Sequence, residues 1–224
     1  MLKIVKTADG SNTIFNSEIG EHYHSTHGAL QESRHVFVNS GLFYFRKNNP
    51  EQKSISILEV GFGTGLNFLL SVDYCEEQNI KLHYTGIEAY PLSPEMIAAT
   101  GYGQFLSTET WITFTEKYEA ALGAPVRFSC ACQLQIANCK LMEFKSDGQF
   151  DIIYFDAFAS ARQPEMWNDG AISYILQSLK PGGVFVTYAI TGNLKRALKG
   201  LGCKVEKAPG APGKREMLRA TKNL

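Results

Sequence analysis

The sequence has no long hydrophobic run, and this absence excludes one class of protein at the outset. A bilayer-spanning helix needs about 18 consecutive apolar residues, and no stretch of the 224 residues approaches that length. The N-terminal segment Met1 to Thr7 is too short and too polar for a signal peptide. Hydrophobic residues make up 44% of the chain and charged residues 20%, which is typical of a globular protein. We therefore expect a cytoplasmic protein with no membrane contact.

Cysteine is also scarce, with five residues, and an odd number argues against a disulfide framework. Cys130 and Cys132 lack the two-residue gap of a zinc knuckle, so we expect buried free thiols. Three histidines within residues 22–27 lie next to Glu21 and form the other candidate metal cluster. A polar loop held by hydrogen bonds is the simpler interpretation. We expect no metal.

Net charge is absent as well, because 22 basic residues balance 22 acidic ones. The distribution is uneven. From Lys180 onward there are ten basic side chains and two acidic ones, a net of +8, so residues 1–179 carry −8. Such asymmetry indicates either a contact with a polyanion or a solvated basic helix face, and the sequence leaves both open.

A glycine-rich turn is the most informative feature that is present. The apolar run Ile55–Val60 is typical of a buried parallel strand, and Leu66 begins a helical pattern. Between them lie Gly61, Gly63 and Gly65, which let the chain turn sharply and let a ligand approach the backbone. A dinucleotide fingerprint needs a small residue where this chain has Leu66. The spacing favours S-adenosylmethionine (SAM) over NAD or FAD.

The rest of the chain alternates strands with helices, which predicts a parallel sheet covered on both faces. Helices are expected after the glycine turn, over residues 164–179 up to the breaker Pro181-Gly182-Gly183, and over 193–199. The last two strands form an antiparallel pair, the mark of a class I SAM-dependent methyltransferase with a Rossmann-like, mostly parallel seven-stranded sheet. After the first strand, the expected strands are residues 82–88, 134–137, 150–155, 184–188, 203–207 and 216–220.

The predicted sheet belongs to a methyltransferase domain over residues 51–224. Residues 1–50 are expected to form an N-terminal extension packed on it, with a hairpin strand at 13–15 and a helix over 28–45 that Gly41 could break. Residues 91–130 exceed one crossover helix, so we predict a helical insert of two or more helices that shapes the substrate entrance.

Ligands of open α/β sheets bind beyond the carboxyl ends of the strands. Glu88 ends the second strand, 23 residues after Gly65, near the spacing of an acid that binds ribose hydroxyls. A solvent-exposed strand-end carboxylate is the alternative. Asn138 and Asp156 end the third and fourth strands. The loop that carries Lys214 and Arg215 should open on this same edge.

Six segments match one known family in order across residues 28–218. The string Gly-Phe-Gly-Thr-Gly-Leu-Asn-Phe and the Asp-Ala-Phe with its downstream Pro-Glu-Met-Trp are fairly specific, whereas Lys-Pro-Gly-Gly is widely shared. On these residues the chain resembles the methyltransferase domain of the MnmC family, the tRNA 5-methylaminomethyl-2-thiouridine biosynthesis proteins. The segments are residues 28–37, 59–68, 155–159, 163–167, 180–183 and 214–218.

The resemblance implies methyl transfer from SAM to the amine of 5-aminomethyl(-2-thio)uridine at the wobble position of tRNA, giving 5-methylaminomethyl(-2-thio)uridine. The partner would be the anticodon stem-loop. In many bacteria the family adds a flavin-dependent oxidoreductase domain. Because this chain ends after the methyltransferase hairpin, we expect no FAD and a separate enzyme that supplies the aminomethyl or carboxymethylaminomethyl intermediate.

The resemblance also implies the site residues. Asn138 stands where the family often has Asp, which puts its contact with adenine in doubt, and Ser160 stands where the family commonly has Pro. The expected cofactor-binding residues are Glu32, Glu59, Gly61, Phe62, Gly63, Gly65, Asn67, Glu88, Asn138 and Asp156.

Asp156 is the candidate catalytic residue, because the substrate amine must lose a proton to attack and a carboxylate can orient it and accept that proton. A helix cap or a loop-bracing Asp is the alternative. Phe158 is predicted to stack on a flipped-out base, with ordinary packing as the alternative. Lys214 and Arg215 are predicted to bind anticodon phosphates.

Three other functions fit parts of the pattern. A SAM-dependent methyltransferase acting on a small-molecule or protein amine would share every cofactor residue, and only the basic face argues against it. An aminopropyltransferase would usually need more acids around a polyamine. A non-catalytic tRNA-binding module would lack SAM binding, which calorimetry would detect.

Overall fold

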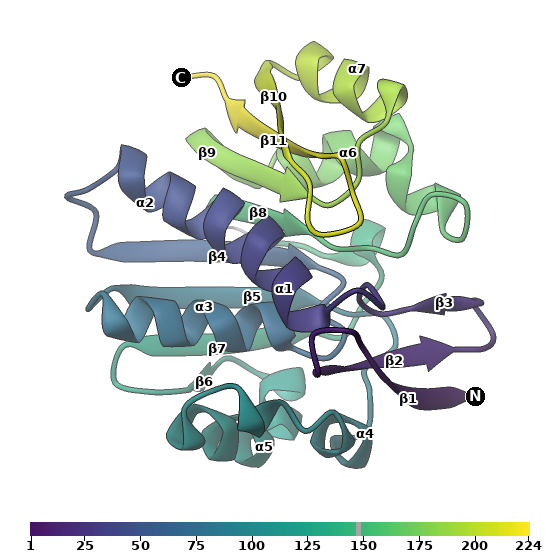
Figure 1. Cartoon of the computed structure of the whole chain (residues 1–224). Coiled ribbons are helices and arrows are strands. Elements are labelled where there is room, and N and C mark those ends of the chain that lie inside the picture. Colours follow the sequence, from purple (N-terminus) through teal and green to yellow (C-terminus); the bar gives the residue numbers. More distant parts are fainter. Residues whose placement is uncertain (147–148) are drawn as a thin grey trace.

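The computed structural model describes residues 1–146 and 149–224, and its centre is one mixed β-sheet (Figure 1). The strand order is β10-β11-β9-β8-β4-β5-β7-β6. Strands β4, β5, β7, β8 and β9 pair in parallel, whereas β11 is antiparallel to both β9 and β10. The predicted mostly parallel sheet with an antiparallel final hairpin is therefore confirmed. An eighth strand, the short β6, pairs antiparallel at one edge and was not predicted.

The main sheet and a small N-terminal sheet together contain all the described strands. The small sheet has the order β1-β2-β3. The bounds are β1 Leu2–Lys6, β2 Asn12–Asn16, β3 Glu21–His22, β4 Ser54–Val60, β5 Lys81–Ile87, β6 Val126–Arg127, β7 Cys132–Ala137, β8 Phe150–Phe155, β9 Leu179–Thr187, β10 Cys203–Pro209 and β11 Glu216–Lys222.

Helices cover both faces of the main sheet (Figure 1). Several begin at a polar side chain that accepts a backbone N–H, as Ser93, Ser107, Asn168 and Thr191 do before α4, α5, α6 and α7. The bounds are α1 Ala29–Ser33, π-helical η1 Arg34–Phe43, α2 Tyr44–Asn48, α3 Leu66–Glu77, α4 Pro94–Ala99, α5 Thr108–Gly123, α6 Asp169–Leu176 and α7 Gly192–Gly200, with short 3₁₀ turns at Tyr102–Gln104, Leu141–Glu143 and Pro164–Trp167.

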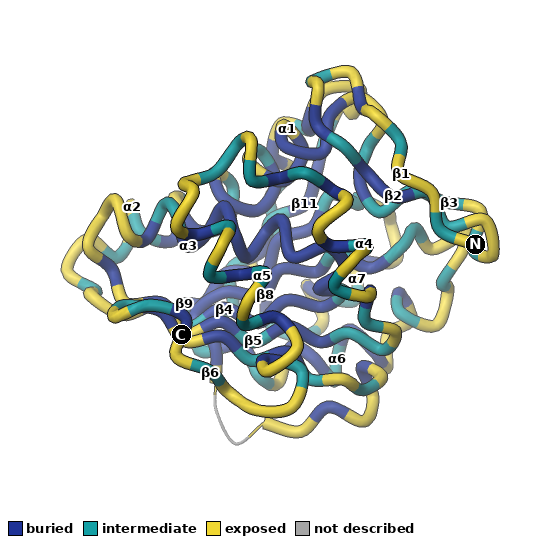
Figure 2. Tube along the Cα trace, turned by 90° about the horizontal axis from the view of Figure 1, so that it is seen from below, coloured by how far each residue is buried: buried dark blue, intermediate teal, exposed yellow. Residues whose placement is uncertain are grey.

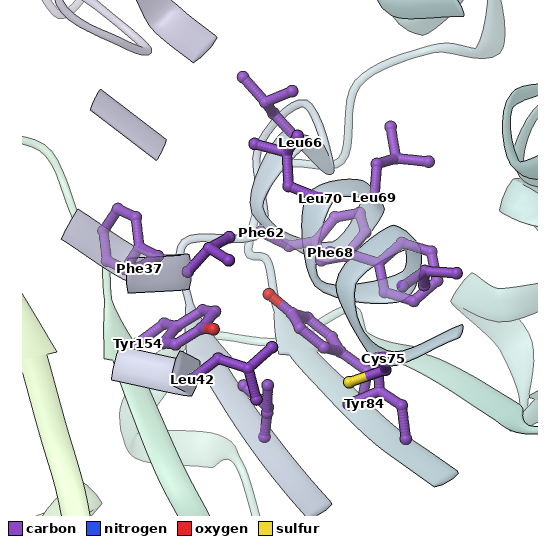
Figure 3. Packing of buried hydrophobic residues seen from close by; sticks show 14 of the residues in the cluster. Phe37, Leu42, Phe62, Leu66, Phe68, Leu69, Leu70, Cys75, Tyr84 and Tyr154 are labelled. Carbon is purple, nitrogen blue, oxygen red and sulfur yellow. The ribbon is translucent and has the colours of Figure 1, made fainter. Parts of the chain in front are cut away.

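Two hydrophobic cores form because the strands are apolar on both faces. Along β4, Ile57 belongs to the core beneath η1 and α3, and Leu58 belongs to the core beneath α6 and α7. Figure 2 shows the resulting band of buried strands through the middle of the molecule. In the first core, the ring of Phe37 on η1 packs 5.2 Å from that of Tyr154 on β8 (Figure 3). Apolar burial of this extent is the main stabilising term of the fold.

Gly41 does not break the predicted helix, although the sequence left a break at this residue open. Residues 29–48 run as one continuous helix through α1, η1 and α2. A Cβ at Gly41 would lie 2.9 Å from the Tyr154 ring and 3.0 Å from Val186. The glycine therefore lets the helix approach the sheet closely.

The segment around Pro181 also differs from the prediction. The helix expected to reach residue 179 ends at Leu176, and Pro181-Gly182-Gly183 lies inside β9 rather than before it. The register of β8 and β9 shifts at this point. A strand can absorb these residues through such an irregularity.

The predicted insert, residues 91–130, contains more than one helix as expected, but it does not shape the entrance. Three of its aromatic side chains, Tyr102, Phe114 and Tyr118, are fully buried in the first core. None of residues 91–130, all of which the structure describes, lines the large cavity considered next.

Candidate active site

A cavity of about 960 Å³ opens at the carboxyl ends of the central parallel strands. This volume is in the range of small-molecule and cofactor sites. Its lining comes from the glycine turn, from the ends of β5 and β8, from residues 139–143, and from the N-terminal segment 16–26. The N-terminal sheet therefore forms the wall that the sequence assigned to the insert.

The glycine turn brings bare backbone to the cavity floor. Gly61 has φ 84°, and a Cβ there would lie 2.5 Å from the carbonyl oxygen of Asp156. The backbone N–H groups of Gly61 and Phe62 both donate to the Ile87 carbonyl, at 3.0 and 3.1 Å. The turn is thus tied to the ends of β5 and β8, and a side chain at Gly61 would separate them.

Glu88 lines the cavity directly after β5. Its Oε2 accepts from the Gly63 N–H at 2.9 Å, and its Oε1 accepts from the Tyr90 N–H at 3.0 Å. A carboxylate has about four acceptor sites. Two backbone bonds therefore fix the carboxylate and leave acceptor capacity for a pair of ligand hydroxyls.

Asp156 lines the cavity at the end of β8 and is supported from behind by buried polar groups. The Asn67 amide donates to Asp156 Oδ2 at 2.8 Å and to Glu59 Oε1 at 2.7 Å. The Tyr84 hydroxyl donates to Glu59 Oε2 at 2.8 Å. Burial, with a smaller contribution from the Glu32 carboxylate, raises the pKa of Asp156 to about 8 against the lowering effects of Asn67 and Lys214. Asp156 can therefore exchange a proton near neutral pH.

An ion pair closes the cavity on the side of α1. Lys214 Nζ lies 2.7 Å from Glu32 Oε1 and 4.0 Å from the centre of the Tyr188 ring. The other oxygen of Glu32 accepts from the Ser25 N–H at 2.8 Å. Charge pairing and a cation–π contact together hold the lysine in place.

The N-terminal sheet is fastened to the loop after β8. The backbone N–H of Ala159 donates to Glu21 Oε2 at 3.1 Å, and the Tyr23 ring meets the Phe158 ring edge to face at 5.1 Å. His24 also lines this wall, and burial lowers its pKa to about 4, so its imidazole is neutral. These contacts make one aromatic and polar wall.

A protein-family model described as S-adenosyl-L-methionine-dependent methyltransferase matches residues 108–223, more than half of the chain. The chain belongs to this methyltransferase family. The match agrees with the fold class inferred from the sheet order and with the cofactor indicated by the glycine spacing.

Among the methyltransferases, the chain is similar to one particular group of proteins. The chain is 32% identical over 219 residues to a tRNA 5-methylaminomethyl-2-thiouridine biosynthesis bifunctional protein MnmC from Leptospira interrogans, covering 92% of this chain and 33% of that protein. The namesake from Pseudomonas savastanoi is 32% identical over 210 residues, covering 89% and 32%. The chain thus spans about a third of the length of these relatives. The crystal structure of MnmC2 from Aquifex aeolicus shares the fold, with TM-score 0.75, 24% identity, and coverage of 99% of this chain and 70% of that chain.

Several predicted cofactor contacts of this methyltransferase lie behind the cavity wall. Glu59 and Asn67 are buried, and their hydrogen bonds support Asp156. Gly65 begins α3, where the Phe114 ring leaves no room for a Cβ. As contacts of the cofactor these three residues stay predictions. Phe62 lines the cavity, although its ring packs into the first core.

Two other predicted contact residues have surroundings that differ from those expected for their predicted roles. Asn138 is exposed and lies outside the described lining, where the next residues, Cys139 and Lys140, take part instead. Lys214 lines the cavity and pairs with Glu32, although the residue also remains exposed to solvent. Arg215 is exposed.

The sequence-based reasoning missed the cavity roles of Tyr188 and of the N-terminal wall. Tyr188 follows β9 directly, and the rule on strand ends could have identified it. Nothing in the sequence indicated that Glu21 and Tyr23 would meet the loop after β8, because about 135 residues separate them. Among the described residues no cluster of three or more His, Cys, Asp or Glu is arranged to hold a metal ion. None of the described helices is both long and apolar enough to cross a bilayer.

Proposed function

We propose that this methyltransferase transfers a methyl group from SAM to the primary amine of 5-aminomethyl(-2-thio)uridine at the wobble position of tRNA. The observation that carries the proposal is Asp156, a carboxyl with a pKa of about 8 at the end of a cavity floored by bare glycine backbone. The similarity to tRNA 5-methylaminomethyl-2-thiouridine biosynthesis proteins supports the choice of tRNA. The substrate must already carry the amine, so a separate activity supplies it.

The polar groups that line the cavity fit SAM. The spare acceptor sites of Glu88 suit the two ribose hydroxyls, and the bare backbone of Gly61 and Gly63 lines the cavity, where a ligand can approach it closely. The Glu32 carboxylate suits the α-ammonium at the charged end of the cofactor. When bound, SAM supplies a methyl group that its sulfonium already activates. Asp156, Phe158 and Tyr188 are then left to receive the nucleoside.

Asp156 orients the incoming amine and accepts its proton. An alkyl ammonium titrates near 10, so it is mostly charged at neutral pH and cannot attack. A carboxylate whose own pKa is about 8 is a far better acceptor for that proton than an ordinary Asp. Phe158, braced edge to face by Tyr23, provides a flat apolar wall for the base and excludes water. Positioning of this kind lowers the barrier by several kcal/mol.

The rate should depend on the protonation of Asp156. Because the base form is the active form, kcat/KM for the RNA should fall about tenfold for each pH unit below about 8. Lys214 lowers the pKa of Asp156, so Lys214→Met should move this break to higher pH. The substrate amine titrates near 10, well above this break, and stays in its ammonium form throughout the range tested. A profile that is flat between pH 6 and 8 would remove Asp156 as the base.

The nucleosides of cellular tRNA test the proposed function directly. In a strain that lacks the gene, mass spectrometry should detect accumulated 5-aminomethyl(-2-thio)uridine and no methylated product. Restoring the wild-type gene should reverse both changes, whereas a gene encoding Asp156→Asn should not. An unchanged nucleoside profile in the deletion strain would refute the assignment and favour a small-molecule or protein amine as the substrate.

A further inference from the structure

The basic C-terminal third divides into cations that hold the fold together and cations that do not. Lys180, Lys204, Lys207, Lys214 and Arg219 form ion pairs with acids, and Lys222 donates to the carbonyl oxygens of Leu176 and Leu179. Four cations remain that form no ion pair with any described acid. They are Lys195, Arg196, Lys199 and Arg215.

Three of the four lie on α7 and face away from the core. Leu194 and Leu198 bury the inner side of this nine-residue helix. Lys195 is partly buried, and Arg196 and Lys199 are exposed. Residues three or four apart lie on the same side of a helix, so Lys199 is a neighbour of both Lys195 and Arg196. We call these three residues the α7 basic strip.

The strip is unfavourable for the isolated fold. Like charges at helical spacing destabilise a helix, and a cation near the N-terminus opposes the helix dipole. The helix contains no acid to offset them. Asp169 shares a surface hollow with Arg196, yet these two form no ion pair among the described contacts. Arg196 donates to the Asn193 side chain and Lys199 lies in the last turn, where a cation is tolerated, but no described acid neutralises any of the three charges. The strip is therefore complementary to an external anion.

Helix α7 begins at the same edge of the sheet as the cavity. Gly192 begins α7 only four residues after Tyr188, which lines the cavity. Arg215 follows Lys214, which reaches into the cavity from the loop between β10 and β11. Figure 1 shows α7 and this loop on the same half of the molecule, next to the final hairpin. A long polyanion whose end enters the cavity can therefore meet both.

We propose that the α7 basic strip, together with Arg215, binds the phosphodiester backbone of the RNA that delivers its base to the cavity. This inference rests on the proposed function and replaces Lys214 as the source of phosphate contacts. The contacts supply affinity and orientation without reading sequence. Lys214, held by Glu32, belongs to the cavity instead.

The test compares two triple variants that remove the same charge. One carries Lys195→Ala, Arg196→Ala and Lys199→Ala, and alanine preserves the helix. The control carries Lys47→Ala, Lys53→Ala and Lys81→Ala, which lie at the amino ends of the strands, opposite the cavity. The Kd for tRNA is measured at several salt concentrations, along with the Kd for SAM and kcat at saturating tRNA.

Each lost phosphate contact lowers the slope of log K against log salt by about 0.7 to 0.9. The strip variant should therefore lose about 2 from this slope and bind tRNA roughly 10- to 100-fold more weakly at low salt. Its kcat at saturating tRNA and its Kd for SAM should stay within about twofold, and the control should match the wild type.

Equal slopes for the strip variant and the wild type would overturn the inference while leaving the proposed function intact, provided that the wild type methylates tRNA. Equal losses in both triple variants would also overturn it, because they would indicate a general charge effect. A wild-type protein that binds SAM but methylates no tRNA would instead refute the proposed function itself.

Discussion

Replacing Asp156 with alanine should slow methyl transfer by at least about 100-fold while the Kd for SAM changes only a few-fold. The carboxyl stands at the end of β8, held by the Asn67 amide at 2.8 Å, and is the cavity acid with a raised pKa. The alanine variant keeps the glycine turn and Glu88, which are the proposed contacts of the nucleoside part of the cofactor. Single-turnover kinetics at saturating SAM and RNA separate the chemical step from binding.

The Asp156→Asn variant tests the same residue without opening a gap. An asparagine oxygen can still accept from Asn67, so a loss of turnover equal to that of alanine would indicate that the proton acceptor, and not the hydrogen bond, is what matters. Normal turnover in either variant would eliminate the proposed role and favour loop bracing. A large rise in the Kd for SAM would instead assign Asp156 to the cofactor.

Stability gives Asp156→Asn a second, independent readout. The folded protein raises the pKa of Asp156 from an ordinary value near 3.8 to about 8, so the folded state binds this proton more tightly than the unfolded chain does. Raising the pH from about 4 to 8 should then lower the free energy of unfolding through this group. Asp156→Asn should lack that loss and be the more stable protein at pH 8, as expected where function costs stability.

The parts of the site that the sequence predicted well are those set by local chain order. Gly61 and Glu88 each follow directly from the end of a strand, and neighbouring parallel strands bring such ends together whatever the remaining residues do. The same rule located Asp156. Asn138 also ends a strand, but its side chain is exposed, because the strand rule fixes where the chain emerges and not where a side chain points.

The parts that were missed depend on contacts between distant segments. Glu32 and Lys214 are 182 residues apart, and their pairing requires the final hairpin loop to fold back over α1. From the sequence alone, the adjacent basic residues Lys214 and Arg215 indicate a phosphate contact as readily as an ion pair with a distant acid. Gly41 shows the same limit in the fold, since only the Tyr154 ring beneath it explains why a glycine in the middle of a helix is useful there.

Adding a single methyl group to the cavity floor, through Gly61→Ala, should impair the protein nearly as much as removing the proposed base Asp156. Gly61→Ala would impose a left-handed φ of 84° on a residue with a Cβ, which costs about 1–2 kcal/mol. The new Cβ would also lie 2.5 Å from the Asp156 carbonyl oxygen, so either the turn or the end of β8 must move. We expect a loss of about 3 kcal/mol in the free energy of unfolding, or a fall in Tm of roughly 6–12 °C.

In the proposed function the cofactor lies against the backbone of the glycine turn. Gly61→Ala should therefore weaken SAM binding at least about tenfold, measured by calorimetry below the Tm of the variant. Gly202→Ala is the matched control, with φ 79° and no atom within 4 Å of its Cβ. It carries the backbone strain alone, so it should lose only about 1 kcal/mol of stability and keep its affinity for SAM. If Gly61→Ala bound SAM as tightly as Gly202→Ala does, the cofactor could not lie against this turn, and the cavity would have to hold a different ligand.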